Sequence, residues 1–259
     1  MPQEKAAKAP VLFVGHGSPM NAIGDNPSRK AWRMMGEELG KPKIIIAVSA
    51  HWLTRGLRVR RSESNPQVND MYGFPRELYA VKYSPAGSVS MADRILEAEK
   101  GAIDVDNTWG IDHGVWSVLS NMYPSADVPV VMMSVNSLAS PREQYAVGER
   151  LAALREEGAM IIASGNVVHN LQMVNWRMRG GYEWADRFDE NMKRLVAERR
   201  IDEIISFDQI TDSDLAIPTT EHFFPLLTAI GATTTDDKLT VWNEYRELGS
   251  MSMTSYLWQ

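Results

Sequence analysis

Five histidines are the residues of this chain best able to do chemistry, and the chain has no cysteine. Imidazole is the commonest metal ligand in proteins and the side chain best suited to proton transfer near neutral pH. The lack of cysteine excludes disulfides, thiolate metal sites, thiol nucleophiles and iron–sulfur clusters. Any transition metal would therefore be held by histidine and carboxylate. The five histidines are His16, His51, His113, His169 and His222.

Three of these histidines follow short apolar runs that are typical of buried strands. His16 comes directly after the first run, His51 directly after the second and His169 a few residues after the fourth. Ligands of open α/β sheets bind outside the carboxyl ends of the strands, so we expect these three side chains to converge on one crevice. The four runs, continuous and rich in β-branched residues, are Val11–Val14, Ile44–Val48, Val128–Val135 and Met160–Ala163.

The other two histidines lie in predicted turns. His113 is flanked by glycines in the segment GIDHG, and His222 precedes Pro225, which is tolerated only near the start of a helix. Non-haem iron sites often combine two histidines with one carboxylate. Asp112 and Glu221 are the carboxylates nearest to these histidines. The sequence predicts a metal site that includes at least two of the five histidines.

The elements around the histidines predict the fold class. Asn26-Pro27 is a typical helix start for a segment that ends before Gly40, Ser140-Pro141 begins a second helix that ends at Gly158, and an apolar stripe predicts a third from Tyr182 to about Arg200. Strands that alternate with helices favour a three-layer α/β/α fold around a mostly parallel or mixed sheet. With no repeat or linker in the sequence, we expect one domain spanning residues 1–259.

One segment does not fit this alternation. Residues 58–87 are rich in proline, asparagine, tyrosine and serine, and they predict a long excursion between elements. Long irregular segments of compact domains are often binding loops. We therefore expect this excursion to contribute to the site.

Several other kinds of site find little support. The segment GHG after the first run lacks the third glycine of a dinucleotide fingerprint, and the chain has no nucleophile elbow, phosphate-binding loop or HExxH zinc helix. Ser18 near His16, or Asp112 beside His113, would be a weak basis for a hydrolytic triad, because adjacent residues on a turn usually point apart.

Bulk composition bears on the partners. The net charge of −6 gives no reason to expect nucleic acid or an anionic membrane as a partner. The stretch from Met1 to Lys8 has no apolar signal core, and no apolar run reaches the length of a membrane span. We therefore expect a cytoplasmic protein, and the sequence leaves its oligomeric state open.

Seven motifs in one order resemble a known family. They are VLFVGHGSPMNAI, SAHW, YGFP with ELY and KY after it, DHGVWSVL, SGNVVHNL, EHFFPLL and the closing SMTSYLW. Together they are similar to the bacterial and plant DOPA extradiol dioxygenases, which belong to the class III extradiol superfamily typified by protocatechuate 4,5-dioxygenase. The resemblance runs from about Val11 to Trp258, which is nearly the whole chain, so it is far more specific than any single motif.

The resemblance implies a role for each histidine. It implies a mononuclear Fe(II) site, with Zn(II) often in its place, and His16 and His51 match the metal-binding histidines. The third ligand of the wider superfamily is a glutamate. In the DOPA-type branch a histidine takes that position, so the resemblance assigns His222 and keeps Glu221 in reserve. His169 matches the acid/base histidine and is a possible fourth ligand, and His113 matches the histidine that assists at the substrate pocket.

The same resemblance implies a reaction. A small aromatic diol, such as 3,4-dihydroxyphenylalanine, would react with O₂ and open to a muconic semialdehyde. Tyr72, Phe74 and Tyr79, on the excursion, are candidates for the wall of the aromatic pocket. One alternative is a tetrapyrrole metal chelatase, which also begins with a strand followed by Gly-His-Gly-Ser but leaves SAHW, DHG and VVHNL unexplained. Another is a non-catalytic metal-binding protein.

Overall fold

The computed structural model describes residues 8–259. Apart from Lys8, the N-terminal stretch from which we expected no signal segment lies outside the described residues. Among residues 8–259, no helix combines the length and the apolar character that a membrane crossing requires.

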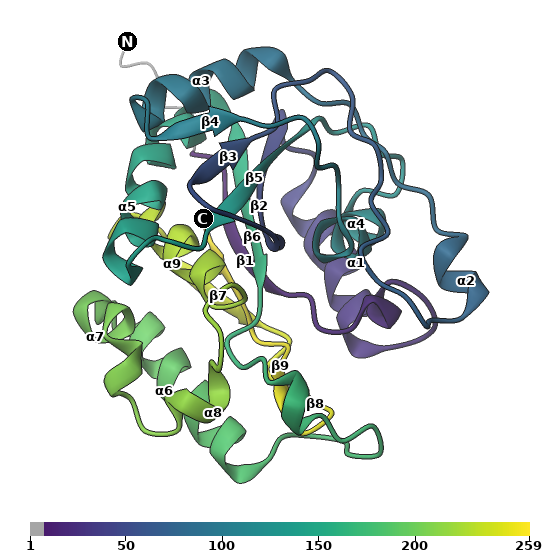
Figure 1. Ribbon diagram of the computed structural model, residues 1–259, viewed down its shortest axis with the longest axis vertical. Coiled ribbons are helices and arrows are strands. Elements are labelled where there is room, and N and C mark those ends of the chain that lie inside the picture. The colour runs from purple at the N-terminus through teal and green to yellow at the C-terminus, as the bar shows by residue number, and fades with distance from the viewer. Residues whose placement is uncertain (1–7) are drawn as a thin grey trace.

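A mixed sheet, eight-stranded within the described residues, forms the centre of the fold (Figure 1). Its strands are, in spatial order, β4 (Ile103–Val105), β3 (Leu57–Val59), β5 (Val130–Asn136), β2 (Ile44–Thr54), β6 (Ala159–Gly165), β1 (Val11–Gly15), β10 (Ser255–Trp258) and β7 (Leu239–Trp242). The four central strands β5, β2, β6 and β1 are parallel to one another. Antiparallel pairs join β3 to β5, β1 to β10 and β10 to β7, so the expected sheet is confirmed in its mixed form.

Helices cover both faces of this sheet, with α1 and α4 on one side and α5 and α9 on the other (Figure 1). The helices are α1 (Pro27–Leu39), α2 (Arg76–Tyr79), α3 (Val89–Glu99), α4 (His113–Met122), α5 (Pro141–Leu151), α6 (Glu183–Ala197), α7 (Ile201–Ile205), α8 (Ser213–Ala216) and α9 (Phe224–Gly231), with short 3₁₀ turns η1 (Pro19–Ala22), η2 (Ala152–Glu157), η3 (Leu171–Met173) and η4 (Phe207–Gln209). A separate ribbon pairs β8 (Arg246–Glu247) with β9 (Met251–Ser252). The arrangement confirms the three-layer α/β/α expectation.

The side chains of the central strands divide between two cores. Leu12 and Val14 of β1 belong to the core that packs against α1 and α4, whereas Val11 and Phe13 belong to the core that packs against α5, α6 and α9. Successive residues of a strand point to opposite faces, so a strand with apolar residues at every position can be buried on both sides. This double burial explains why the strand sequences are continuous rather than alternating.

The two predicted helix starts are confirmed, because each begins with a polar cap followed by proline. The side chain of Asn26 accepts a hydrogen bond from the backbone N–H of Arg29 at 2.8 Å before α1. Ser140 and Glu143 form a reciprocal capping box before α5. Each cap satisfies a backbone donor that the first turn leaves without a partner.

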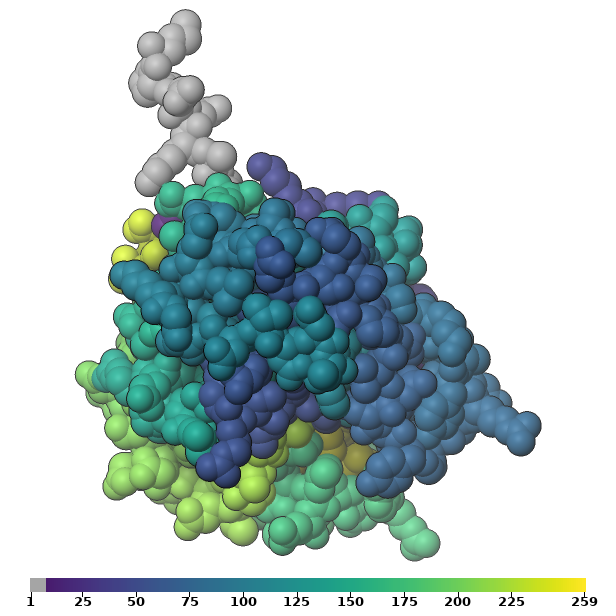
Figure 2. Space-filling model, turned by 45° about the horizontal axis from the view of Figure 1, so that its top comes forward, coloured from purple at the N-terminus to yellow at the C-terminus, as the bar shows by residue number. Residues whose placement is uncertain are grey.

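The excursion of residues 58–87 stands out from one side of the molecule at α2 (Figures 1 and 2). Its base is fixed to the loop before α4, since the N–H of Val68 donates to the carbonyl of Ile111 at 2.8 Å and the N–H of Ile111 donates to the carbonyl of Pro66 at 2.9 Å. A Cβ on Gly110 would lie 1.9 Å from that Pro66 oxygen, so this approach requires glycine. The excursion is therefore tied to the segment that carries His113.

Candidate metal centre

His16 is the first residue after β1, as the sequence predicts. Its backbone N–H donates to the carbonyl of Gly165, at the end of the adjacent strand β6, at 3.2 Å. The side chain is only 1% exposed. The ends of two neighbouring parallel strands thus hold this histidine inside the protein.

His51 lies within β2, so the expectation that the strand ends before it is wrong. The pairing of β2 with β5 passes from Ser49 opposite Ser134 directly to Leu53 opposite Val135, which leaves residues 50–52 as a bulge. Bulges occur beside active sites because the extra residues redirect a side chain out of the regular pattern. Here the bulge carries His51.

His222 lies in the turn just before α9, as expected from Pro225. The backbone N–H of Asn166 donates to the carbonyl of His222 at 2.9 Å. A Cβ on Gly165 would lie 2.1 Å from the same oxygen, so only glycine at the end of β6 lets this turn come so close. The turn before α9 is therefore held against the ends of the central strands.

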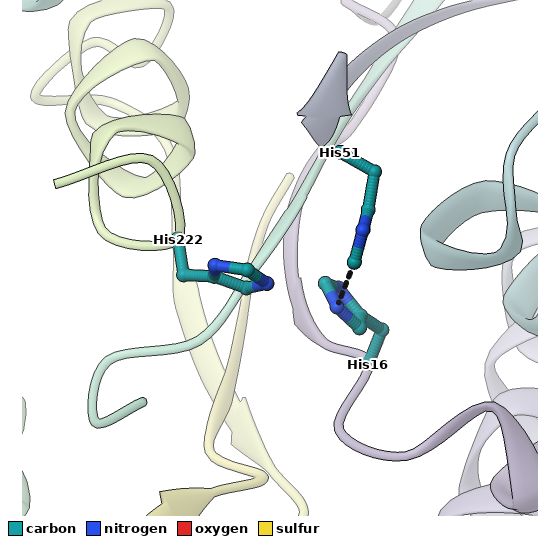
Figure 3. Close-up of side chains that lie close together, drawn as sticks. All are labelled: His16, His51 and His222. Atoms are coloured by element: carbon teal, nitrogen blue, oxygen red, sulfur yellow. Dashed lines mark hydrogen bonds between the residues drawn. The ribbon is translucent and has the colours of Figure 1, made fainter. Parts of the chain in front are cut away.

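The three imidazoles of His16, His51 and His222 converge (Figure 3). Their ring centroids are 4.9 to 5.4 Å apart. One potential ligand atom from each lies within 4.8 Å of the other two. The Nε2 atoms of His16 and His51 are 3.0 Å apart.

Hydrogen bonds determine which nitrogen of His16 carries the proton. Its Nδ1 lies 2.9 Å from the hydroxyl of Ser164, and that hydroxyl donates its single hydrogen to the carbonyl of Gly114. The Ser164 oxygen must therefore accept from His16, so Nδ1 is the protonated nitrogen of a neutral ring. The lone pair of His16 is on Nε2.

The other two rings have the same arrangement, each with a carboxylate at Nδ1. Nδ1 of His51 lies 3.2 Å from Asp70, and Nδ1 of His222 lies 3.1 Å from Glu221. A carboxylate accepts, so Nδ1 donates in both rings and Nε2 carries the lone pair. Histidines that bind metals are usually oriented in this way, by a hydrogen bond from the nitrogen that does not bind.

This donor set fits a metal ion. Nε2 of His222 is buried and has no hydrogen-bond partner among the described residues. The facing lone pairs of His16 and His51, 3.0 Å apart, would repel each other unless a proton or a cation lay between them. A buried polar atom without a partner is costly, and a metal that accepts all three lone pairs would remove that cost.

The pKa values of the three rings keep two of them neutral. Burial, reinforced by the neighbouring histidines, lowers the pKa of His16 and of His222 well below the ordinary value. Burial also acts to lower the pKa of His51, but the hydrogen bond to Asp70 and the nearby carboxylates Asp112 and Glu221 outweigh it and raise that pKa. Without a metal, His51 is therefore the ring of the three that takes up a proton first.

His113 is the first residue of α4 rather than part of a turn, so that expectation is corrected. Its ring centroid lies 3.9 Å from that of His51. A Cβ on Gly114 would lie 2.9 Å from the His51 ring and 3.4 Å from the His16 ring, so the glycine lets the start of the helix approach both. The GIDHG pattern therefore reflects close packing of a helix start against the centre.

His169 lies beside His222, four residues after β6 ends. The two rings stack, with centroids 3.5 Å apart and planes at 9°. Its backbone N–H donates to the carbonyl of Ala216 at 2.9 Å. Burial, reinforced by His51, lowers the pKa of His169 to about 4, so its ring is neutral at physiological pH. All five histidines are thus gathered in one place, although only three belong to the converging set.

A cavity of about 400 Å³ lies over this cluster, and all five histidines line it. Apart from Asp70 and residues 17–19, the rest of its lining is apolar and comes from the excursion (Met71, Phe74), from η3 and the loop after it (Leu171, Val174, Trp176) and from the segment around β9 (Leu248, Met251). A pocket with an apolar lining and a few convergent polar groups is typical of a site for a small molecule. An aromatic ring with polar substituents matches that lining.

Of the three aromatic residues expected in the wall, only Phe74 lines the cavity. Tyr72 is 90% exposed and lies outside the lining, so that prediction is wrong. Tyr79, in α2 of the same excursion, packs partly buried against the core, and its hydroxyl accepts a hydrogen bond from the N–H of Phe74 at 3.4 Å. Composition alone does not reveal which side of the excursion an aromatic residue faces.

Asp112 was wrongly predicted as a candidate carboxylate of the site, and Asp70 was missed. Asp112 accepts hydrogen bonds from the Ser49 hydroxyl at 2.7 Å and the Trp109 indole at 2.9 Å, and it belongs to none of the groups of described residues that could hold a metal ion. Asp70, which contacts both His51 and His113, was not predicted. It lies in the irregular excursion, where the sequence has no spacing signal, and its position beside YGFP was the only available hint.

Comparison with known proteins identifies the family. A family model described as the catalytic LigB subunit of aromatic ring-opening dioxygenase matches residues 11–257. The chain belongs to this LigB family. The expected relationship to class III extradiol dioxygenases is thereby confirmed.

Individual relatives of the LigB family match over nearly their full lengths. A 4,5-DOPA dioxygenase extradiol of Escherichia coli is 40% identical, over 96% of this chain and 94% of its own. A 4,5-DOPA dioxygenase extradiol of Beta vulgaris is 36% identical, over 95% of this chain and 94% of its own. The crystal structure of an uncharacterized protein from Escherichia coli superposes with a TM-score of 0.85 at 38% identity, covering 96% of this chain and 99% of that chain.

Proposed function

We propose that this chain is an extradiol dioxygenase that opens the ring of a catechol with O₂, and that His16, His51 and His222 hold its catalytic metal. One observation carries the proposal: the imidazoles of the three histidines converge, with one ligand atom of each within 4.8 Å of the others, at a mainly apolar cavity of about 400 Å³. Membership of the LigB family supports ring opening over the two alternatives, a tetrapyrrole metal chelatase and a non-catalytic metal-binding protein.

Different residues of the site have different proposed roles. Catechol enters the cavity with its ring against apolar side chains such as Phe74 and its two hydroxyls toward the histidines. Activation of O₂ beside the bound diol is the chemistry that Fe(II) supplies in such a site. The apolar lining excludes water from the ring while it reacts.

His169 and His113 are proposed to take part in proton transfer. His169 has a lowered pKa and is neutral at physiological pH, so its ring is free to accept a proton from a hydroxyl of the diol. Its stacking on His222 keeps it beside the metal ligands, where it is also a candidate fourth ligand in the absence of substrate. His113, on the other side of His51, assists at the substrate hydroxyls.

We propose Fe(II) as the metal that supports turnover and Zn(II) as a competing occupant. A set of three neutral imidazoles, with Glu221 engaged at Nδ1 of His222, suits both ions, because imidazole binds zinc and iron alike. Zinc has no redox chemistry, so a zinc-loaded protein would bind catechol without opening it. The substrate we propose is a catechol with a substituent, such as 3,4-dihydroxyphenylalanine, the compound named in the descriptions of the relatives.

The decisive experiment follows the oxygen atoms. The metal-free protein is reconstituted with Fe(II) under nitrogen, given a catechol and then supplied with labelled O₂, and the product is examined by mass spectrometry. We expect both labelled atoms in a ring-opened product. A quinone that carries no label, formed at the rate at which the catechol is consumed, would contradict the proposal. Zinc-loaded protein serves as the control. Iron insertion into a porphyrin without oxygen uptake would favour the chelatase alternative.

A further inference from the structure

Asp70 makes three hydrogen bonds that join two histidines of the site. One carboxylate oxygen, Oδ2, lies 2.8 Å from Nδ1 of His113 and 3.2 Å from Nδ1 of His51. The other oxygen, Oδ1, accepts from the backbone N–H of His113 at 2.9 Å. A single carboxylate thus contacts the helix start, a cavity-lining ring and a ring of the converging set.

The donors and acceptors at Asp70 permit only one arrangement. Oδ1 accepts the backbone N–H of His113, and a carboxyl group is ordinarily ionised at neutral pH. An ionised carboxylate only accepts, so both imidazoles must present N–H to it. In a neutral ring the second nitrogen then carries the lone pair, and in His51 and His113 alike that nitrogen is Nε2.

A metal ion bound directly by Asp70 is the competing explanation, because His51, Asp70 and His113 together could also hold one. That site would use the Nδ1 lone pair of His51 and so place the ring proton on Nε2, which lies 3.0 Å from Nε2 of His16. A neutral imidazole offers one lone pair only. His51 therefore serves either the three-histidine set or a metal at Asp70, and the convergence of three Nε2 atoms favours the first.

We propose that Asp70 is a positioning residue that sets the tautomer of both His51 and His113, so that each presents its Nε2 lone pair to the site. The part that concerns His51 rests on the proposed metal centre, whereas the part that concerns His113 does not. The ring that holds the metal and the ring that assists the substrate share the same acceptor atom, so both functions depend on one carboxylate. The excursion supplies this atom, which gives that irregular segment a defined role.

Asparagine at position 70 separates this role from simple packing. It has nearly the same shape as aspartate but only one acceptor atom. If the amide oxygen faces the two imidazoles, the amide nitrogen faces the His113 backbone N–H, donor against donor. If the amide is turned over, its N–H groups face both imidazoles and favour protons on Nε2. The second orientation keeps the hydrogen bond from the His113 backbone N–H and avoids the donor–donor clash, so we expect this orientation and the shift to Nε2 that it favours.

The first test reads the tautomer of His113 directly. Nitrogen-15 NMR of histidine-labelled protein, metal-free and zinc-loaded, distinguishes a proton on Nδ1 from one on Nε2. We expect His113 to carry it on Nδ1 in the wild type and to shift toward Nε2 in Asp70→Asn. The matched control is Asp112→Asn, which changes a more deeply buried aspartate next to His113 whose side chain bonds only Ser49 and Trp109. Asp112→Asn should leave the His113 tautomer unchanged.

The second test asks whether Asp70 acts through His113 during turnover. We expect Asp70→Asn to lower kcat by about 10- to 100-fold, the usual cost of removing an orienting partner. In a His113→Gln background the same change should cost clearly less, because the ring it orients is already gone. Effects of the two substitutions that multiply fully would overturn the part of the proposal that concerns His113.

The outcomes also separate this inference from the proposed function. A wild-type His113 with its proton on Nε2, or an Asp70→Asn protein with both rings in unchanged tautomers, would overturn the positioning role even if catechols are opened. If the iron-loaded wild type opens no catechol, the proposed function fails, but the NMR measurement on the metal-free protein still decides the role of Asp70 at His113.

Discussion

The cavity is lined by two kinds of structure, and they differ in how tightly they are held. His16 and His222, at the ends of the central strands and the start of α9, are 1% and 7% exposed. Leu171 and Trp176, from η3 and the loop after it, are 65% and 74% exposed although they line the same cavity. The first region places nitrogen atoms, whereas the second offers apolar surface.

This difference follows from what each region must do. The proposed metal binding requires lone pairs at fixed positions, and each ring of the converging set has a polar partner at Nδ1 and lies at the ends of the central strands. Contact with an aromatic ring requires only apolar area, which an exposed loop can supply. We therefore expect substitutions in the first region to abolish metal binding and those in the second to change substrate preference.

The largest effect is expected from His222→Ala. It removes the one lone pair of the converging set that has no partner among the described residues, so the ion loses one of three protein ligands. We expect metal content after dialysis, measured by elemental analysis, to fall nearly to zero, with turnover lost in parallel. The protein should still fold, because the substitution changes the turn before α9 and leaves the central sheet unaltered. Full retention of metal would show that the three-histidine set is not the binding site.

A smaller effect is expected from His169→Gln, because His169 stacks on the set without being part of it. We expect metal content to remain close to that of the wild type while kcat falls by about a hundredfold, the typical contribution of a positioned acid or base. The pH dependence of the rate should lose its acid limb in the variant. Loss of metal together with activity would instead identify His169 as an essential ligand.

The smallest effect is expected from Trp176→Ala in the exposed region. The side chain contributes to the lining but to little of the core, so unfolding free energy should change by less than about 0.5 kcal/mol, as is usual for surface positions. We expect unchanged metal content and a KM for catechols that rises several-fold with little change in kcat. Steady-state kinetics on two catechols with different substituents measures this, and a loss of metal would erase the proposed distinction between the regions.

Much of the fold was predictable from local signals. The cap and proline pairs at residues 26–27 and 140–141 predicted both helix starts, because a cap satisfies backbone donors within a few residues of itself. The continuous apolar runs predicted the central parallel strands, because burial on both faces leaves no polar position. Such signals depend on neighbours along the chain.

The errors occurred where distant segments decide the outcome. The bulge that carries His51 depends on how β2 pairs with β5, and the placement of His113 at a helix start depends on the packing of α4 against the centre. The outward position of Tyr72 depends on the path of the excursion. Neither pairing nor path is encoded within a few residues, so spacing alone could not predict them.

The sequence by itself determined the donors available to the site: five histidines, no cysteine, and glycines where backbones come close. For His16 and His51, only the tertiary structure decided which nitrogen carries a lone pair, because their partners Ser164 and Asp70 are not their neighbours in the chain. The tertiary structure also decided which three histidines converge and that Asp70 lies beside His51, for the same reason. A tautomer is set by the hydrogen bond at the opposite nitrogen, and such bonds exist only once the chain has folded.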